Sequence, residues 1–142
     1  MRSDRSDIRG RMAKEVPMIL DTCALLWLAS GDKKISRPTL KQINKAAAVY
    51  VSAISGFEIT IKASCGKLIL PPSPQEWFEK VIEHHGLTVL PLELNICVAA
   101  AELPSIHNDP CDRFIIATAK LNELTVLTID ENFEKYDLTI LS

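Results

Sequence analysis

Short apolar runs alternate with longer stretches of helical periodicity along most of this 142-residue chain. We predict strands from the apolar runs at 17–21, 48–51, 87–90, 124–129 and 138–141. Helical patterns lie between them, around 24–28, from 37 and from 74 onward, and at 54–65, 94–103 and 111–122. This alternation is typical of βαβ units. The sequence therefore predicts a three-layer α/β/α domain with a mostly parallel central sheet.

Several helix ends carry local signals of their own. Gly31 is expected to end the first helix, and Ser36 is expected to cap the second. Ser73 and Glu76 have the spacing of a capping box, with Pro74 at the first helical position. These boundaries are predicted from neighbouring residues alone.

The amino-terminal segment differs in composition from the rest of the chain. Residues 1–17 hold five basic and three acidic side chains, a local charge of +2 in a chain of net charge −2, and have no apolar periodicity. We expect a disordered arm or an upstream start codon, with Met12 and Met18 as alternative starts. The folded domain is predicted to occupy residues 18–142.

Composition narrows the class of protein. The content of 47% hydrophobic and 24% charged residues is that of an ordinary globular domain. No apolar run approaches the roughly 20 residues of a membrane span, and no signal peptide is evident, so the cytoplasm is the expected location. The cysteines lack C-x-x-C spacing, and buried reduced thiols are favoured over zinc or disulfides. They are Cys23, Cys65, Cys97 and Cys111.

Four carboxylates stand where the pattern turns from strand to helix or where a helix begins. Asp21 follows the first strand, Asp130 follows the fourth, and Asp109 and Asp112 flank Pro110. Three of them would also make good helix N-caps, and Asp112 would be favoured in a first turn by the helix dipole. However, the carboxyl ends of parallel strands share one edge of the sheet, where open α/β folds bind ligands. Acids gathered there repel one another unless a cation lies between them, and oxygen ligands favour Mg²⁺ or Mn²⁺.

Glu58 is harder to explain as a structural residue. The helical period places it on an apolar face that is expected to pack inward, formed by Ile54, Phe57, Ile61 and Cys65. A carboxylate there costs several kcal/mol unless it is paired or bound to a metal. The structural alternative is an i,i+4 pair with Lys62.

Five segments occur in the order and with the spacing of one known family. They are Ile19-Leu20-Asp21-Thr22, Ser52-x-x-Ser55-x-Phe57-Glu58-Ile59-x-Ile61-Lys62, Gly66-Lys67-Leu68, His107-x-Asp109-Pro110-x-Asp112-Arg113-x-Ile115-Ile116-Ala117 and Leu127-Thr128-x-Asp130-x-x-Phe133. Together they resemble a PIN domain, and in particular the VapC-type toxins of type II toxin–antitoxin pairs. The resemblance runs from about residue 18 to residue 142.

The resemblance implies a metal-dependent endoribonuclease with an acidic quartet that holds Mg²⁺ or Mn²⁺. The residues that fall on the quartet are Asp21, Glu58, Asp112 and Asp130. Asp109 matches an additional acid near the metal, and the hydroxyls of Thr22 and Thr128 stand next to quartet positions. Similar chains usually carry an aromatic residue in place of Cys111 and often tryptophan in place of Phe57, which leaves the acids intact.

Partners and products are implied in the same way. The family cleaves RNA phosphodiesters with metal-activated water, which leaves a 5′-phosphate and a 3′-hydroxyl. It also implies a homodimer, and an antitoxin of VapB type whose carboxy-terminal segment occupies the groove of the toxin. No membrane partner is expected.

A basic ridge is the predicted RNA contact. Arg37, Lys41 and Lys45 recur every four positions on one helix, and Lys62 and Lys67 are candidates to extend the ridge. The ridge would track backbone phosphates, although a solvated helix face explains the same spacing.

Three other readings remain open at this point. A receiver-type phosphoacceptor would need a second acid beside Asp21, and its central strand would end in an aspartate where this chain has Ser52. A haloacid-dehalogenase-like phosphatase would need Asp-x-Asp, which Cys23 breaks. A PIN-fold RNA- or protein-binding module without turnover would keep the same fold.

His107 is expected to orient the loop of Asp109 rather than to act as a base.

Overall fold

The structure is a computed structural model that describes residues 16–70 and 73–142. Its strands are β1 (Met18–Leu20), β2 (Val49–Ser52), β3 (Leu87–Leu90), β4 (Thr125–Leu127) and β5 (Ile140–Leu141). They form one sheet in the order β3-β2-β1-β4-β5, and every neighbouring pair is parallel. The predicted arm, residues 1–17, lies outside the described residues apart from Val16 and Pro17.

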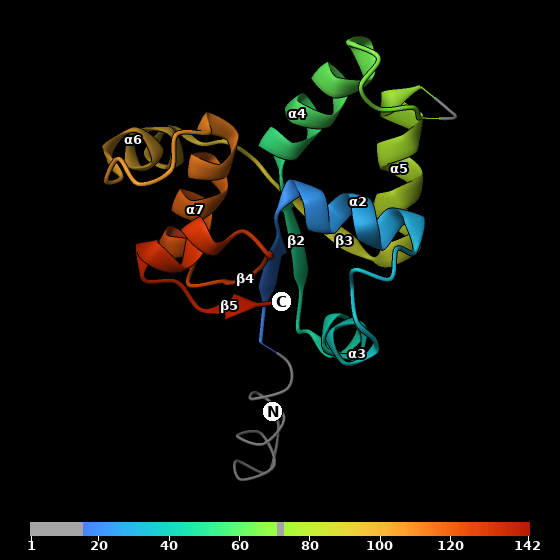
Figure 1. Cartoon of the computed structure of the whole chain (residues 1–142), viewed down its shortest axis with the longest axis horizontal. Coiled ribbons are helices and arrows are strands. Elements are labelled where there is room, and N and C mark those ends of the chain that lie inside the picture. The colour runs from blue at the N-terminus through green and yellow to red at the C-terminus, as the bar shows by residue number, and fades with distance from the viewer. Residues whose placement is uncertain (1–15, 71–72) are drawn as a thin grey trace, which may run out of the picture.

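Helices cover both faces of this sheet. They are α2 (Thr22–Ser30), α3 (Arg37–Lys45), α4 (Ala53–Ser64), α5 (Pro74–His85), α6 (Leu94–Glu102), α7 (Pro110–Asn122) and the 3₁₀ helix η1 (Glu131–Tyr136). Figure 1 shows α6 and α7 on one side of the strands and α2 and α5 on the other. The predicted α/β/α architecture is confirmed, and the sheet is parallel in all of its described pairs.

The central strand β1 contributes to two separate cores. Met18 and Leu20 pack with Leu25 of α2 on one face, and Ile19 packs with Ile115 of α7 on the other. Successive side chains of a strand point to opposite faces, which is why a continuous apolar run suits a strand covered on both sides. The end of β1 is therefore held at a fixed point in the molecule.

The local boundary signals are confirmed. The hydroxyl of Ser36 accepts from the Thr39 N–H at 3.3 Å, and that of Ser73 accepts from the Glu76 N–H at 3.3 Å. Gly31 adopts φ 69°, a left-handed conformation that costs glycine little, and ends α2 there.

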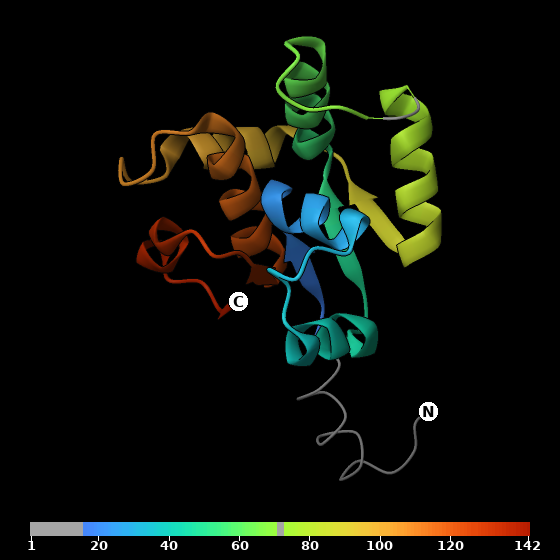
Figure 2. The ribbon, with the colours of Figure 1, turned by 45° about the vertical axis from the view of Figure 1, so that its right-hand side comes forward.

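The apolar face predicted for α4 is wrong in part. Ile54 is buried, but Phe57 is 61% exposed and Ile61 is 47% exposed, and Cys65 just beyond the helix is exposed as well. Ile59, outside the predicted stripe, is fully buried instead. Figure 2 shows α4 projecting beyond the end of the sheet, so part of the helix extends past the layer that the strands form.

The expectation of buried cysteines is also corrected. The four thiols are free, but Cys23 and Cys65 are exposed, and Cys97 and Cys111 are half-buried. Desolvation, followed by the charges of Glu58 and nearby aspartates, raises the pKa of Cys111 to about 11, so this thiol stays protonated at neutral pH. Among the described helices, none has the length and apolar character needed to span a bilayer.

Candidate metal centre

The predicted acids meet at the end of the sheet where the strands finish. Asp21 follows β1 directly, Asp130 follows β4, and Asp112 lies in the first turn of α7. The charges of Asp130 and Glu58 contribute to the raised pKa of Asp21. The charges of Asp109, Glu58 and Asp21 contribute to that of Asp112. These mutual influences place all five carboxylates in one electrostatic cluster.

Asp21 is the most firmly held of these acids. Its Oδ1 accepts from the Ala24 N–H at 2.7 Å as the N-cap of α2, and its Oδ2 accepts from the Thr128 hydroxyl at 2.6 Å. The side chain is buried, with only 6% of the residue exposed. Desolvation raises the pKa of this carboxyl, and the two hydrogen bonds oppose that shift. Both the capping role and the site role predicted for Asp21 fit this geometry.

The two hydroxyls beside the acids behave differently. Thr128 is buried, donates to Asp21, and accepts from the Asp130 N–H at 3.0 Å, so it joins two of the acids. Thr22 is buried against Ser55, with 2.9 Å between their hydroxyl oxygens. Thr128 therefore contacts the centre directly, whereas Thr22 fixes α2 against α4.

Glu58 keeps one oxygen without a partner. Its Oε2 lies 3.4 Å from the Lys62 Nζ, which is the i,i+4 pair that the sequence offered as an alternative. Its Oε1 is buried and has no hydrogen-bond partner, and no other buried side-chain polar atom in residues 16–70 and 73–142 is left in this way. A buried carboxylate oxygen without a donor costs free energy, so the pair with Lys62 does not account for this side chain.

Asp112 is the acid whose ionisation is most disturbed. Desolvation, followed by the charge of Asp109, raises its pKa to about 7, and the proximity of His107 opposes the shift. Asp109 caps α7, since its Oδ1 accepts from the Cys111 N–H at 2.9 Å. The structure therefore brings Asp109 close to the quartet while its cap bond uses one of its oxygens.

His107 lies between two of the predicted ligands. Its Nε2 is 2.9 Å from the Asp112 Oδ2 and 3.0 Å from the Asp130 Oδ2. One ligand atom from each of these three residues lies within 4.8 Å of the others, a spacing compatible with a shared ion. The predicted orienting role holds, because Nδ1 accepts from the Asp109 N–H at 3.2 Å. The contact between His107 and Asp130 was not predicted, because the two residues are brought together only by the fold.

The donors that meet here suit a hard divalent cation. They are carboxylate oxygens, which Mg²⁺ and Mn²⁺ prefer, and one of them, Glu58 Oε1, is buried without a partner. Asp130 retains its Oδ2 for the centre while its Oδ1 caps η1 by accepting from the Asn132 N–H at 2.9 Å. The residues present therefore fit a Mg²⁺ or Mn²⁺ ion.

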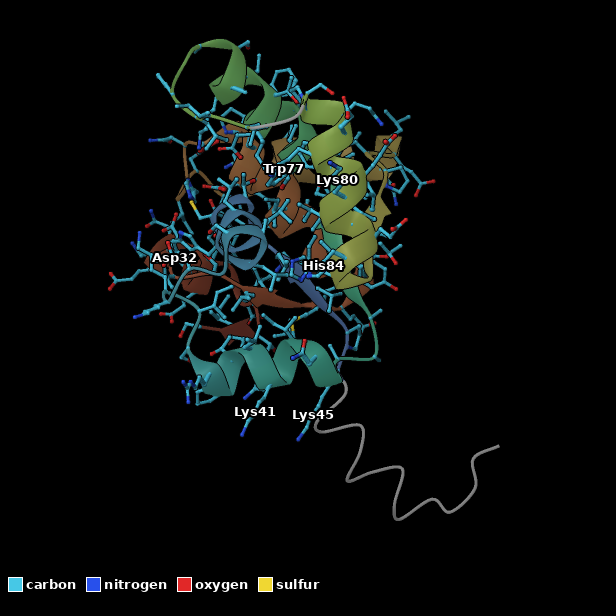
Figure 3. The ribbon with its side chains drawn as sticks, turned by 90° about the vertical axis from the view of Figure 1, so that its right-hand side faces the viewer. Asp32, Lys41, Lys45, Trp77, Lys80 and His84 are labelled. Carbon is cyan, nitrogen blue, oxygen red and sulfur yellow. The ribbon has the colours of Figure 1, made fainter. Side chains whose placement is uncertain are left out.

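The basic ridge does not lie next to the acidic centre. Arg37, Lys41 and Lys45 lie on α3, which leads into the start of β2, whereas the acids follow the ends of strands. Figure 3 shows Lys41 and Lys45 pointing away from the body of the molecule. Lys62 is the predicted cation that touches the centre, through Glu58, and Lys67 is exposed beyond the end of α4.

The fold and the acidic centre are both typical of one known protein family. The model of the PIN domain family matches residues 18–138, and the chain belongs to that family. The receiver-type and haloacid-dehalogenase-like alternatives are thereby set aside.

Individual relatives point to one branch of the family. The chain is 26% identical to Ribonuclease VapC22 of Mycobacterium tuberculosis (strain ATCC 25618 / H37Rv) over 120 residues, which cover 84% of this chain and 91% of the relative. Its fold is similar to a chain of VapBC2 from Rickettsia felis bound to a promoter DNA fragment, with a TM-score of 0.68, 14% identity, and coverage of 89% and 98%. It is also similar to a chain of FitAcB from Neisseria gonorrhoeae, with a TM-score of 0.61, 21% identity, and coverage of 88% and 96%. The resemblance to VapC-type toxins is therefore confirmed.

Proposed function

We propose that this PIN domain is a Mg²⁺- or Mn²⁺-dependent endoribonuclease and the toxin of a type II toxin–antitoxin pair. The observation that carries the proposal is the buried Oε1 of Glu58, which has no partner among the described residues yet lies among other carboxylates. A cation bound there would supply the missing contact and offset the mutual repulsion of the acids. The similarity to a relative named as a ribonuclease supports RNA as the substrate.

Four side chains would hold the ion, namely Asp21, Glu58, Asp112 and Asp130. Asp109 stands beside them as a further negative charge. When bound, the ion lowers the pKa of a water molecule, orients the phosphate and neutralises charge that develops on it. The family pattern of products, a 5′-phosphate and a 3′-hydroxyl, is part of the proposal.

The remaining residues of the centre hold the carboxylates in place. Thr128 fixes the rotamer of Asp21 through a 2.6 Å hydrogen bond and also accepts from the backbone of Asp130. Thr22 and Ser55 tie the first turns of α2 and α4 together, which sets the distance between Asp21 and the helix of Glu58. Lys62 lies at the edge of the centre, where its charge would face an approaching phosphate.

The proposed partners follow from the relatives. Similar folds occur in VapBC and FitAB assemblies, some of them bound to DNA, and we extend that arrangement to this chain as a homodimer with a VapB-type antitoxin. Exposed apolar side chains support a partner surface, since Phe57 and Ile61 of α4 and Ile69 beyond it are open to solvent. We propose that the toxin and its antitoxin act in the cytoplasm.

One assay tests the catalytic part. Purified protein is incubated with labelled RNA in Mn²⁺, in Mg²⁺ and in EDTA, and the Asp21→Asn variant is compared with the parent. The matched control is Asp32→Asn, because Asp32 is exposed and lies at the far end of α2, as Figure 3 indicates.

We expect cleavage by the parent and by the control in either metal, and none in EDTA or with Asp21→Asn. RNA that binds the parent but is not cleaved under any metal condition would favour the PIN-fold binding module instead. Cleavage that persisted in EDTA would contradict a metal centre.

A further inference from the structure

We infer that His107 is a positioning residue, whose Nε2–H holds Asp112 and Asp130 at the separation that a shared cation requires. The inference rests on the proposed metal-dependent function and adds a residue to it. The Nε2 atom is hydrogen-bonded to the Asp130 Oδ2 at 3.0 Å and lies 2.9 Å from the Asp112 Oδ2. One ring nitrogen thus contacts both acids.

The hydrogen bond on the other ring nitrogen decides which role the imidazole has. The Asp109 N–H donates to Nδ1 at 3.2 Å, so Nδ1 acts as an acceptor and the ring proton lies on Nε2. In that tautomer Nε2 has no lone pair to give to a cation. His107 therefore donates to Asp130, and its Nε2–H lies beside Asp112, instead of joining them as a ligand.

Two side chains fix the loop that carries this ring. The Tyr136 hydroxyl accepts from the His107 N–H at 2.7 Å and donates to the Pro104 carbonyl at 2.7 Å. The Arg113 guanidinium donates to the carbonyls of His107, at 3.1 Å, and Pro104, at 3.0 Å. The edge of the ring also packs against Phe133, with the ring centroids 5.9 Å apart. These contacts leave the imidazole little freedom to turn away.

A group that contacts both carboxylates is useful here because the two acids belong to separate parts of the fold. Asp112 is on α7 and Asp130 precedes η1, and as like charges they would move apart in the absence of a cation. The Asp130 side chain is 35% exposed, so its burial alone does not hold it. An N–H between them keeps both carboxylates directed at one point before the ion arrives.

The test measures Mn²⁺ binding by calorimetry in the absence of RNA, with three variants of His107. His107→Ala removes the donor, His107→Gln places an amide N–H near the position of Nε2, and His107→Asn is too short to reach both acids. His84→Ala is the matched control, because His84 is exposed on α5, away from the acids. Melting temperatures in EDTA check that each variant is folded.

We expect His107→Ala to bind Mn²⁺ about tenfold more weakly or worse, and His107→Gln to stay within about threefold of the parent. His107→Asn should resemble His107→Ala, and the control should resemble the parent. Parent-like or tighter binding by His107→Ala would overturn the inference, as would a failure of His107→Gln to restore affinity.

A second measurement needs neither metal nor a variant. The side-chain nitrogen NMR shifts of His107 in the EDTA-treated parent should identify a protonated Nε2 and an unprotonated Nδ1. The opposite tautomer would overturn the inference even if a variant failed to fold. A parent that bound no Mn²⁺ at all would instead contradict the proposed function, so the two failures are distinguishable.

Discussion

Asp21 and Glu58 belong to the same acidic centre, yet their carboxylates differ in how fully their oxygens are hydrogen-bonded. Asp21 has both oxygens engaged, one by the backbone of α2 and one by Thr128, and it is buried at the end of the central strand. Glu58 has one oxygen near Lys62 and the other buried without a partner. The fold therefore supports Asp21 through its own hydrogen bonds, whereas Glu58 Oε1 has no partner in the described part of the chain.

The largest effect is expected on RNA cleavage, and it should be similar for variants of Asp21 and of Glu58. Asp21→Asn and Glu58→Gln should each lower metal-dependent RNA cleavage by about 100-fold or more, because each removes charge from a proposed ligand of the ion and with it several kcal/mol of transition-state stabilisation. Initial rates in Mn²⁺, with folding checked by circular dichroism, measure this. Near-parental cleavage by either folded variant would remove that acid from the quartet.

The free energy of unfolding should respond differently to the loss of Asp21 and to the loss of Glu58. Asp21→Ala leaves the Ala24 N–H and the Thr128 hydroxyl without their acceptor, and should lower the free energy of unfolding by about 1–3 kcal/mol. Glu58→Ala loses only a partly exposed pair with Lys62 and relieves repulsion, so in EDTA it should be neutral or stabilising. Urea unfolding of both variants in EDTA measures the gap, and equal losses would contradict the contrast.

The charged form of Asp112, like that of Glu58, is expected to lower the stability of the metal-free protein. For Asp112 this should appear as a pH dependence of the stability. Its pKa is raised to about 7 in the folded state, so the native protein holds this proton more tightly than the unfolded chain. Stability from this group is therefore greatest below the unfolded pKa of about 4, falls as pH rises toward 7, and levels off above it.

Asp112→Asn should remove that part of the pH dependence and melt at the same or a higher temperature than the parent in EDTA at pH 8. It should be inactive and gain much less from millimolar Mn²⁺, because it has lost a proposed ligand. Melting curves of both proteins with EDTA and with Mn²⁺ provide the comparison. A variant that is less stable in EDTA yet gains as much from Mn²⁺ would make Asp112 a structural residue of the helix start.

The smallest effect is expected away from the centre. Replacing Arg37, Lys41 and Lys45 with alanine should weaken RNA binding across sequences and reduce the slope of log affinity against log salt by up to about three phosphate contacts, while cleavage of bound RNA persists. Lys80→Ala, on the exposed surface of α5, is the control. An unchanged salt slope would return this ridge to a solvated helix face.

The features of this protein that depend on neighbouring residues could be predicted from the amino-acid sequence. The alternation of apolar runs and helical patterns predicted the parallel α/β/α fold, and residues such as Ser36, Ser73 and Gly31 marked helix ends through bonds to residues a few positions away. The acids could be found for the same reason. Each stands at a strand end or in the first turns of a helix, and parallel strands bring those positions to one edge of the sheet.

The hydrogen-bond partners of those acids depend on long-range packing and could not be predicted in this way. The contact of His107 with Asp130 depends on a loop held by Tyr136 and Arg113, and Glu58 Oε1 lacks a partner because of what packs around it. The exposure of Phe57 likewise depends on how α4 is packed in the tertiary structure. Periodicity says which face of a helix is apolar, but not whether another layer covers it, because burial and long-range hydrogen bonds are set by elements distant in sequence.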